Sequence, residues 1–87
     1  MAYAITIKSS AQKELKCLPA KDRRLIESRI IALSTDPHPV GFKALKGKIF
    51  KGLYRIRSGN YRIIYQVLVE ELIILVVKIG DRKDVYG

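Results

Sequence analysis

The chain has 87 residues, of which 48% are hydrophobic and 29% are charged. This size and balance fit one small folded domain and exclude a disordered chain. The longest apolar run, Leu72–Val77, is far shorter than the roughly 18 residues that a membrane-spanning helix needs, and the N-terminus lacks the pattern of a secretion signal. The formal net charge of +9 favours an anionic partner, with nucleic acid as the leading candidate.

The chain contains one cysteine, Cys17, and one histidine, His38. These single copies exclude an internal disulfide, a cysteine-based zinc cluster and most histidine-rich metal sites. We expect Cys17 to pack in the core, His38 to lie at the surface, and the protein to work in the reducing cytoplasm. The glycines are too scattered to cradle a nucleotide, so the sequence predicts neither a metal nor a cofactor.

The first 39 residues predict a strand followed by two helices. Alternating apolar residues over 3–7 indicate a half-buried strand. A helix is expected to begin at Ser9, where Ser9 and Gln12 form a capping-box pattern, and to end before Pro19. A second helix then runs to about Ser34 and stops at the prolines that follow. Four apolar residues share one face of it: Leu25, Ile26, Ile30 and Leu33.

The second half of the chain reads as three strands. Aromatic and β-branched residues are dense over 50–57, 61–69 and 72–79. Gly59-Asn60 is a two-residue hairpin signal, and Glu70-Glu71 suits a second turn. The sequence therefore predicts a single α+β domain spanning 1–87, in which a helical hairpin packs on one face of an antiparallel meander.

Pairing the strands outward from the Gly59-Asn60 turn brings arginines together. In this register Arg57 lies directly opposite Arg62, and Arg55, Arg57 and Arg62 project from one face. Opposed like charges are destabilising by some tenths to about 1 kcal/mol. Such an arrangement is better tolerated when an anion is meant to sit between the guanidinium groups.

The second turn returns the end of the last strand to this cluster. It is expected to place Ile79 beside Arg62, and it puts Lys78 opposite Ile63 on the core face, which a slip by one residue or a bulge would correct. Two residues beyond the strand can then reach the same anion: Arg82 and Tyr86.

Residues 37–69 carry seven basic and no acidic side chains. A loop of lysines contributes to this excess, and its simplest interpretation is a solvated loop. If the arginines bind phosphate, these lysines supply sequence-independent contacts to an RNA backbone. The lysines are Lys43, Lys46, Lys48 and Lys51.

An arginine site of this kind fits one reaction of RNA. The 2′-hydroxyl can attack its own adjacent phosphate and expel the 5′-oxygen, so the substrate brings its own nucleophile. The protein then has to orient the RNA, stabilise the developing negative charge and protonate the leaving group. A tyrosine can orient or stack on the substrate, and a partner that aligns the RNA first would raise the rate.

Three segments resemble the signature of the RelE/ParE superfamily of toxin–antitoxin toxins: 45–47 (Leu-Lys-Gly), 53–65 and 80–86. The resemblance implies a RelE-like fold and, for the RelE branch, an endonuclease that cuts mRNA in the ribosomal A site. It also implies an antitoxin that neutralises the toxin by covering its basic face.

The resemblance further implies roles for individual residues. Arg62 matches the arginine that stabilises the scissile phosphate. Arg82 matches the arginine that stabilises charge or protonates the leaving oxygen. Tyr86 matches a tyrosine that orients the substrate. Two more basic residues fall where RelE members place them on the preceding strand: Arg55 and Arg57.

The sequence differs from the RelE pattern at two positions. Leu53 stands where RelE enzymes commonly carry a lysine, for which Lys51 is a candidate replacement, and Asp81 stands where many relatives have histidine. The general base is therefore left open. Two other functions are also left open, namely a ParE-like inhibitor of DNA gyrase and a non-catalytic basic module that binds RNA.

Overall fold

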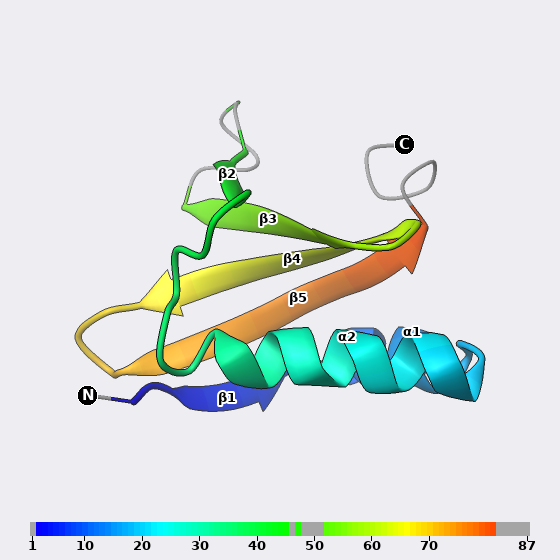
Figure 1. Cartoon of the computed structure of the whole chain (residues 1–87). Helices are drawn as coiled ribbons and strands as arrows, with labels where there is room; N and C mark the ends of the chain where they lie inside the picture. The colour runs from blue at the N-terminus through cyan, green and yellow to red at the C-terminus, as the bar shows by residue number, and fades with distance from the viewer. Residues whose placement is uncertain (1, 46, 48–51, 82–87) are drawn as a thin grey trace.

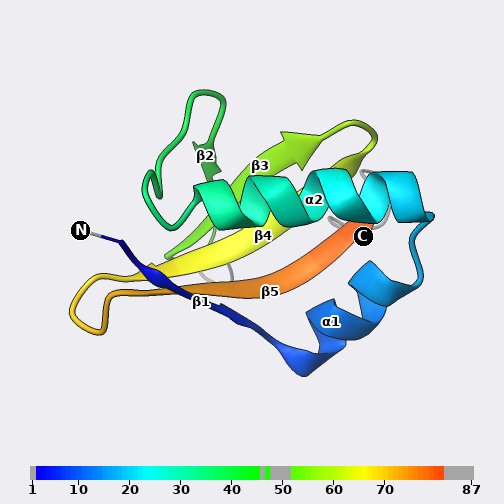
Figure 2. The same cartoon turned by 60° about the horizontal axis from the view of Figure 1, so that its bottom comes forward.

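The computed structural model describes residues 2–45, 47 and 52–81. It is a five-stranded mixed sheet in the order β1-β5-β4-β3-β2, with two helices on one face (Figures 1 and 2). The predicted α+β fold is thus confirmed. Within the described ranges no helix is long and apolar enough to cross a membrane. The elements are β1 (Ala4–Ile7), α1 (Ser9–Lys16), α2 (Ala20–Ala32), β2 (Lys43–Ala44), β3 (Leu53–Ser58), β4 (Tyr61–Leu68) and β5 (Ile73–Asp81).

The helices follow the predicted boundaries, but three details of the helical hairpin differ from the expected ones. The capping box does not form, because no side chain caps α1 and the Gln12 amide instead donates to the carbonyl of Ile7 at 2.8 Å. Leu25 is half exposed, because the buried stripe of α2 centres on Ile26 and Ile30 and the adjacent position points about 100° away. Cys17, expected in the core, is exposed just after α1, whereas Leu15 and Leu18 on either side of it contact the core.

The β3–β4 hairpin has the predicted register. Arg57 pairs with Arg62 and Ser58 pairs with Tyr61, and Gly59 takes a φ of +61° in the turn, which glycine adopts without a steric penalty. The strand begins at Leu53 rather than near residue 50, because Gly52 has a φ of +83° and breaks the extended backbone.

The β4–β5 register is the predicted one from Leu68–Ile73 to Tyr65–Val76, and beyond those pairs it shifts by one residue. A bulge between Ile64 and Tyr65 separates the pairs Ile64–Lys78 and Tyr65–Val76. This bulge inserts one extra residue into β5 and moves Lys78 off the core face. Gly80, not Ile79, therefore lies opposite Arg62. The strand also begins later than predicted, because Leu72 has a φ of +55° and belongs to the turn.

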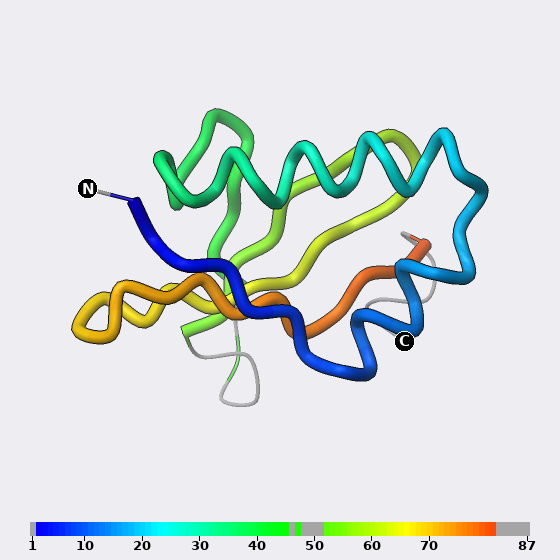
Figure 3. The backbone as a smooth tube through the Cα atoms, turned by 90° about the horizontal axis from the view of Figure 1, so that it is seen from below, coloured from blue at the N-terminus to red at the C-terminus, as the bar shows by residue number. Residues whose placement is uncertain are grey.

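The core lies between the sheet and the helices, whose backbone path is seen from below in Figure 3. It is built almost entirely from aliphatic side chains of α2 and the three central strands. The largest fully buried side chains are Tyr65, Ile26, Ile30, Leu33, Ile63, Ile74, Ile79 and Val76.

Two short strands extend the meander at its edges. β2 pairs with β3 through Lys43–Arg55 and Ala44–Tyr54. β1 pairs in parallel with β5, from Ala4–Ile73 to Ile7–Val76, so it covers only the first half of that strand.

Glu14 of α1 covers the second half of the β5 edge. Its Oε1 accepts the backbone N–H of Ile79 at 3.1 Å, and its Oε2 forms an ion pair with Lys78 Nζ at 2.9 Å. An open strand edge leaves backbone N–H groups without the partners that a neighbouring strand would supply. Here the Glu14 carboxylate supplies the acceptor for one of them. The end of β5 is thereby tied to α1.

We expect Glu14→Ala to lower the free energy of unfolding by about 1–2 kcal/mol, because it removes a charge-assisted hydrogen bond to the backbone. Glu14→Gln keeps an acceptor for the Ile79 N–H and should lose less. Urea unfolding of the three proteins tests this, and equal stability of the alanine and glutamine variants would contradict it.

Candidate nucleic-acid interface

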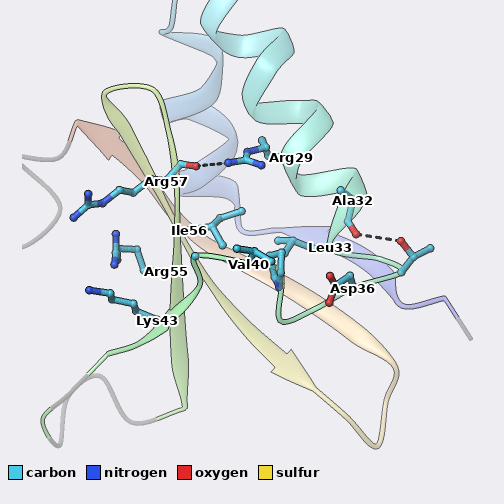
Figure 4. Close-up of a pocket in the computed structure, with 12 residues that line it drawn as sticks. Arg29, Ala32, Leu33, Asp36, Val40, Lys43, Arg55, Ile56 and Arg57 are labelled. Carbon is cyan, nitrogen blue, oxygen red and sulfur yellow. Dashed lines mark hydrogen bonds between the residues drawn. The ribbon is translucent and has the colours of Figure 1, made fainter.

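Four basic side chains lie on the face of the sheet opposite the helices. We call this set the cationic face: Lys43, Arg55, Arg57 and Arg62. Strand pairing places Lys43 beside Arg55 and Arg57 beside Arg62, and alternation along β3 puts these residues opposite the core residue Ile56. Figure 4 shows Lys43, Arg55 and Arg57 in one column on the same side of β3.

The members of the cationic face differ in exposure. Arg57 is exposed and Arg62 is half-buried, whereas only 4% of Arg55 is exposed. Arg55 lies on the predicted face but is shielded from solvent, because it sits in mid-strand between Lys43 and the buried Ile64. Lys43, expected in a solvated loop, belongs to β2. The exposed cationic groups of this face are thus Arg57 and Lys43, with Arg62 partly accessible.

The end of β5 meets the cationic face at Arg62. Gly80 lies opposite Arg62, and Asp81 lies opposite Tyr61, so the last residues of β5 lie beside the Arg57–Arg62 pair. Arg82 follows directly in the sequence. Five predicted site residues lie outside the described part of the chain, and their roles remain predictions: Lys46, Lys48, Lys51, Arg82 and Tyr86.

Tyr61 borders the same end of the sheet. Its hydroxyl donates to Asp22 Oδ2 of α2 at 3.4 Å. Burial raises the pKa of Tyr61, and the carboxylates of Asp22 and Asp81 raise it further. The phenol is therefore held in its protonated, hydrogen-bond-donating form. No local pattern indicates this contact, because its partners are 39 residues apart.

A pocket of about 430 Å³ adjoins the cationic face at the outer edge of β3. Its walls come from the end of α2, the loop over 35–41 and the strand residues Arg55, Ile56 and Arg57 (Figure 4). Arg29 of α2 lines it and donates from Nη2 to the Arg57 carbonyl at 3.0 Å. Arg29 was not predicted as a site residue. Its position next to the buried Ile30, at the border of the apolar stripe, is the signal that could have found it.

The loop that walls this pocket is firmly held. The Tyr65 hydroxyl donates to the Pro37 carbonyl at 2.6 Å. His38 contacts the rings of Phe42 and Tyr54 at centroid distances of 5.0 and 5.1 Å, and Tyr54 contacts Tyr65 at 5.8 Å. These aromatic contacts anchor the loop to the sheet. His38 is exposed, as expected.

The cationic face can bind and stabilise a phosphate, since guanidinium groups donate several hydrogen bonds in a fixed plane. Across residues 2–45, 47 and 52–81, no three His, Cys, Asp or Glu side chains gather in a metal-binding group. The chemistry that these side chains offer is charge stabilisation and hydrogen bonding.

Toxins of toxin–antitoxin systems share this small α+β fold. A family model described as the ParE toxin of type II toxin–antitoxin systems matches residues 5–86. The chain therefore belongs to the RelE/ParE superfamily and is a toxin of a toxin–antitoxin system.

Similar proteins come from the RelE branch. The RelE1 toxin protein of Methanocaldococcus jannaschii is 34% identical, with 99% of this chain and 97% of that protein covered. The mRNA interferase toxin RelE of Escherichia coli is 27% identical, with 100% and 93% covered. The crystal structure of the RelE–RelB complex of Pyrococcus horikoshii superposes with a TM-score of 0.81 at 29% identity, covering 97% and 99%.

The opposed arginines lead to a prediction about stability. We expect Arg57→Thr to leave the free energy of unfolding unchanged or to raise it by about 0.2–1 kcal/mol at low salt, because it removes a like-charge pair and keeps a good strand former. The Arg29 bond uses the backbone carbonyl and survives the change. Urea unfolding at low and high salt tests this. A large loss of stability that persists at high salt would contradict it.

Proposed function

We propose that this toxin is a ribosome-dependent endoribonuclease that cleaves mRNA in the A site. One observation carries the proposal, namely the Arg57–Arg62 pair beside the end of β5. Guanidinium groups held on neighbouring strands of one face can donate hydrogen bonds to the same phosphate. A scissile phosphate is such a ligand, and Arg82 enters the sequence directly after the strand end.

The proposed reaction is internal to the RNA. The 2′-oxygen attacks the adjacent phosphorus while the bond from phosphorus to the 5′-oxygen breaks, leaving a 2′,3′-cyclic phosphate and a 5′-hydroxyl. One proton leaves the 2′-hydroxyl and one is delivered to the 5′-oxygen. In this mechanism Arg62 stabilises charge on the phosphate, Arg82 stabilises or protonates the leaving oxygen, and Tyr86 orients the substrate. Arg55 and Arg57 contribute positive electrostatic potential beside the phosphate.

Two partners follow from this proposal. The ribosome aligns the mRNA, which supplies the orientation that a small site lacking a histidine base needs. The second partner is a cognate antitoxin that covers the cationic face. Support for it comes from the RelE–RelB complexes of similar proteins, including those of Pyrococcus horikoshii and Escherichia coli. Lys43, Lys46, Lys48 and Lys51 would add contacts to the RNA backbone.

An in vitro translation reaction with the purified protein tests the proposal. The mRNA is mapped by primer extension with and without ribosomes, for the wild type and Arg82→Ala. We expect discrete cuts that need ribosomes and that disappear in the variant. Arg24→Ala is the matched control, because it removes an exposed arginine from α2, and it should cut normally. Intact mRNA with normal protein synthesis would contradict the proposal.

A ParE-like activity is the second candidate, because the matching family model is that of a ParE toxin. In that case the protein would bind DNA gyrase and cut no RNA. Inhibition of gyrase supercoiling by the purified toxin, with translation continuing, would favour it. A non-catalytic basic module would instead bind RNA with an affinity that falls with salt and would cut nothing at any ribosome concentration.

A further inference from the structure

We propose that the pocket beside β3 binds one nucleotide of the RNA that crosses the cationic face. This inference rests on the proposed function and deepens it by assigning a substrate subsite. The pocket, about 430 Å³ in volume, falls within the ~300–1,000 Å³ typical of small-molecule sites. It has a basic side, an apolar wall and one carboxylate, which are the features that a phosphate and a base require.

The basic side is partly preorganised. Arg29 donates one N–H to the Arg57 carbonyl at 3.0 Å, and a guanidinium group has five such donors. The side chain is therefore fixed by one bond while its other donors stay available for a phosphate. Lys43 and Arg57 line the same pocket and are exposed. Because Arg29 is already ordered in the free protein, binding a phosphate costs little further side-chain entropy.

The apolar wall faces a base. Val40 is fully exposed at the pocket, although most valines are buried. The neighbouring Gly41 has a φ of +90°, a conformation that other residues rarely adopt, so the loop presents Val40 outward. Val40 and Ala32 of α2 together form an apolar surface. A bound base would remove this surface from water, which is favourable.

The carboxylate gives the site a preference among bases. Asp36 lines the pocket, and its Oδ1 accepts the backbone N–H of His38 at 3.3 Å, which orients the group. Figure 4 shows Asp36 on the opposite side of β3 from Lys43, Arg55 and Arg57. An ionised carboxylate only accepts hydrogen bonds. It therefore favours a base with an exocyclic amino group, such as cytosine, over uracil.

The position of the pocket favours RNA over a protein partner. Arg57 belongs to both the cationic face and the pocket, so a strand of RNA bound on the face continues into it. A peptide that added a strand to the outer edge of β3 would need the Arg57 carbonyl. That carbonyl is already occupied by Arg29.

Amide chemical shifts of the purified full chain test the inference. The protein is titrated with cytidine 5′-monophosphate, uridine 5′-monophosphate and inorganic phosphate. We expect saturable shifts at the amides of Ala32, Val40 and Gly41. Cytidine monophosphate should bind roughly threefold to tenfold more tightly than the uridine nucleotide, as one added hydrogen bond predicts. Asp36→Asn should remove that preference.

Two variants test the pocket, one by filling it and one by repelling the nucleotide. Ala32→Trp occupies the pocket, and Ile31→Trp is its control because Ile31 is exposed on the same helix and does not line the pocket. Val40→Glu places a negative charge at the pocket without touching the core, with the exposed Val69 as the control position. We expect Ala32→Trp and Val40→Glu to weaken nucleotide binding at least about tenfold, and both controls to bind normally.

Several outcomes would overturn the inference. Equal shifts with inorganic phosphate and both nucleotides would show only an anion site, and pocket shifts seen with an acidic peptide alone would show a protein site. The titration contains no ribosomes, so it is independent of cleavage. If Ala32→Trp binds nucleotide and cuts mRNA as the wild type does, the subsite is wrong and the nuclease proposal stands. If the pocket binds nucleotide but nothing is cut, the nuclease proposal fails instead.

Discussion

Replacing Arg62 by alanine is expected to reduce ribosome-dependent cleavage at least about 100-fold, the effect typical of removing one group that stabilises transition-state charge. Arg62 lies opposite Arg57 and beside Gly80 at the strand end, so it is the described residue best placed to meet a phosphate there. The rate is measured as mRNA cut per ribosome complex in single-turnover reactions, and toxicity on expression should fall in parallel.

Two controls separate this role from a structural one. Arg62→Lys keeps the charge and loses the planar fork, so it should restore part of the activity, whereas Arg24→Ala on α2 should cut as the wild type does. Circular dichroism and urea unfolding check that the Arg62→Ala variant is folded. A folded Arg62→Ala protein that cuts at the wild-type rate would remove this residue from the mechanism.

The parts of the fold that local sequence determines were predictable. Gly59-Asn60 defines a two-residue turn, and a two-residue turn defines the pairing of the strands on either side. For that reason the opposed pair Arg57 and Arg62 follows from the amino-acid sequence alone. The helix ends were predictable for the same kind of reason, since Pro19 and the prolines after Asp36 stop a helix by removing backbone donors.

The parts that depend on distant contacts were not predictable. The misplaced Lys78 indicated either a slip or a bulge, but the position of the bulge in β5 and the parallel pairing of β1 follow from how the sheet twists and packs. β2 has only two residues, too few for a periodic pattern. Glu14 meets Ile79 across 65 residues of sequence, and Arg29 meets Arg57 across 28. The sequence around Arg29 places it beside the apolar stripe of α2 but does not indicate its distant partner, so the pocket beside β3 was missed.

Tyr65 leads to the largest expected pH effect on stability. Burial, and to a lesser degree Tyr54 and Asp36, raise its pKa from 10.0 to about 12. Below pH 10 the phenol is protonated in both the folded and the unfolded chain. Between pH 10 and about 12 only the unfolded chain releases the proton, so the free energy of unfolding should fall by roughly 3 kcal/mol from this group.

Tyr65→Phe isolates this contribution. At neutral pH the variant should be less stable by about 1–2 kcal/mol, because the Pro37 carbonyl loses the donor that sits at 2.6 Å. Phenylalanine has no proton to release, so the variant should lose less stability than the wild type as the pH rises from 10 to about 12, and the gap between the two proteins should close and then reverse. Urea unfolding across this range measures it. Parallel stability curves for the two proteins would show that the buried phenol titrates as it does in the unfolded chain.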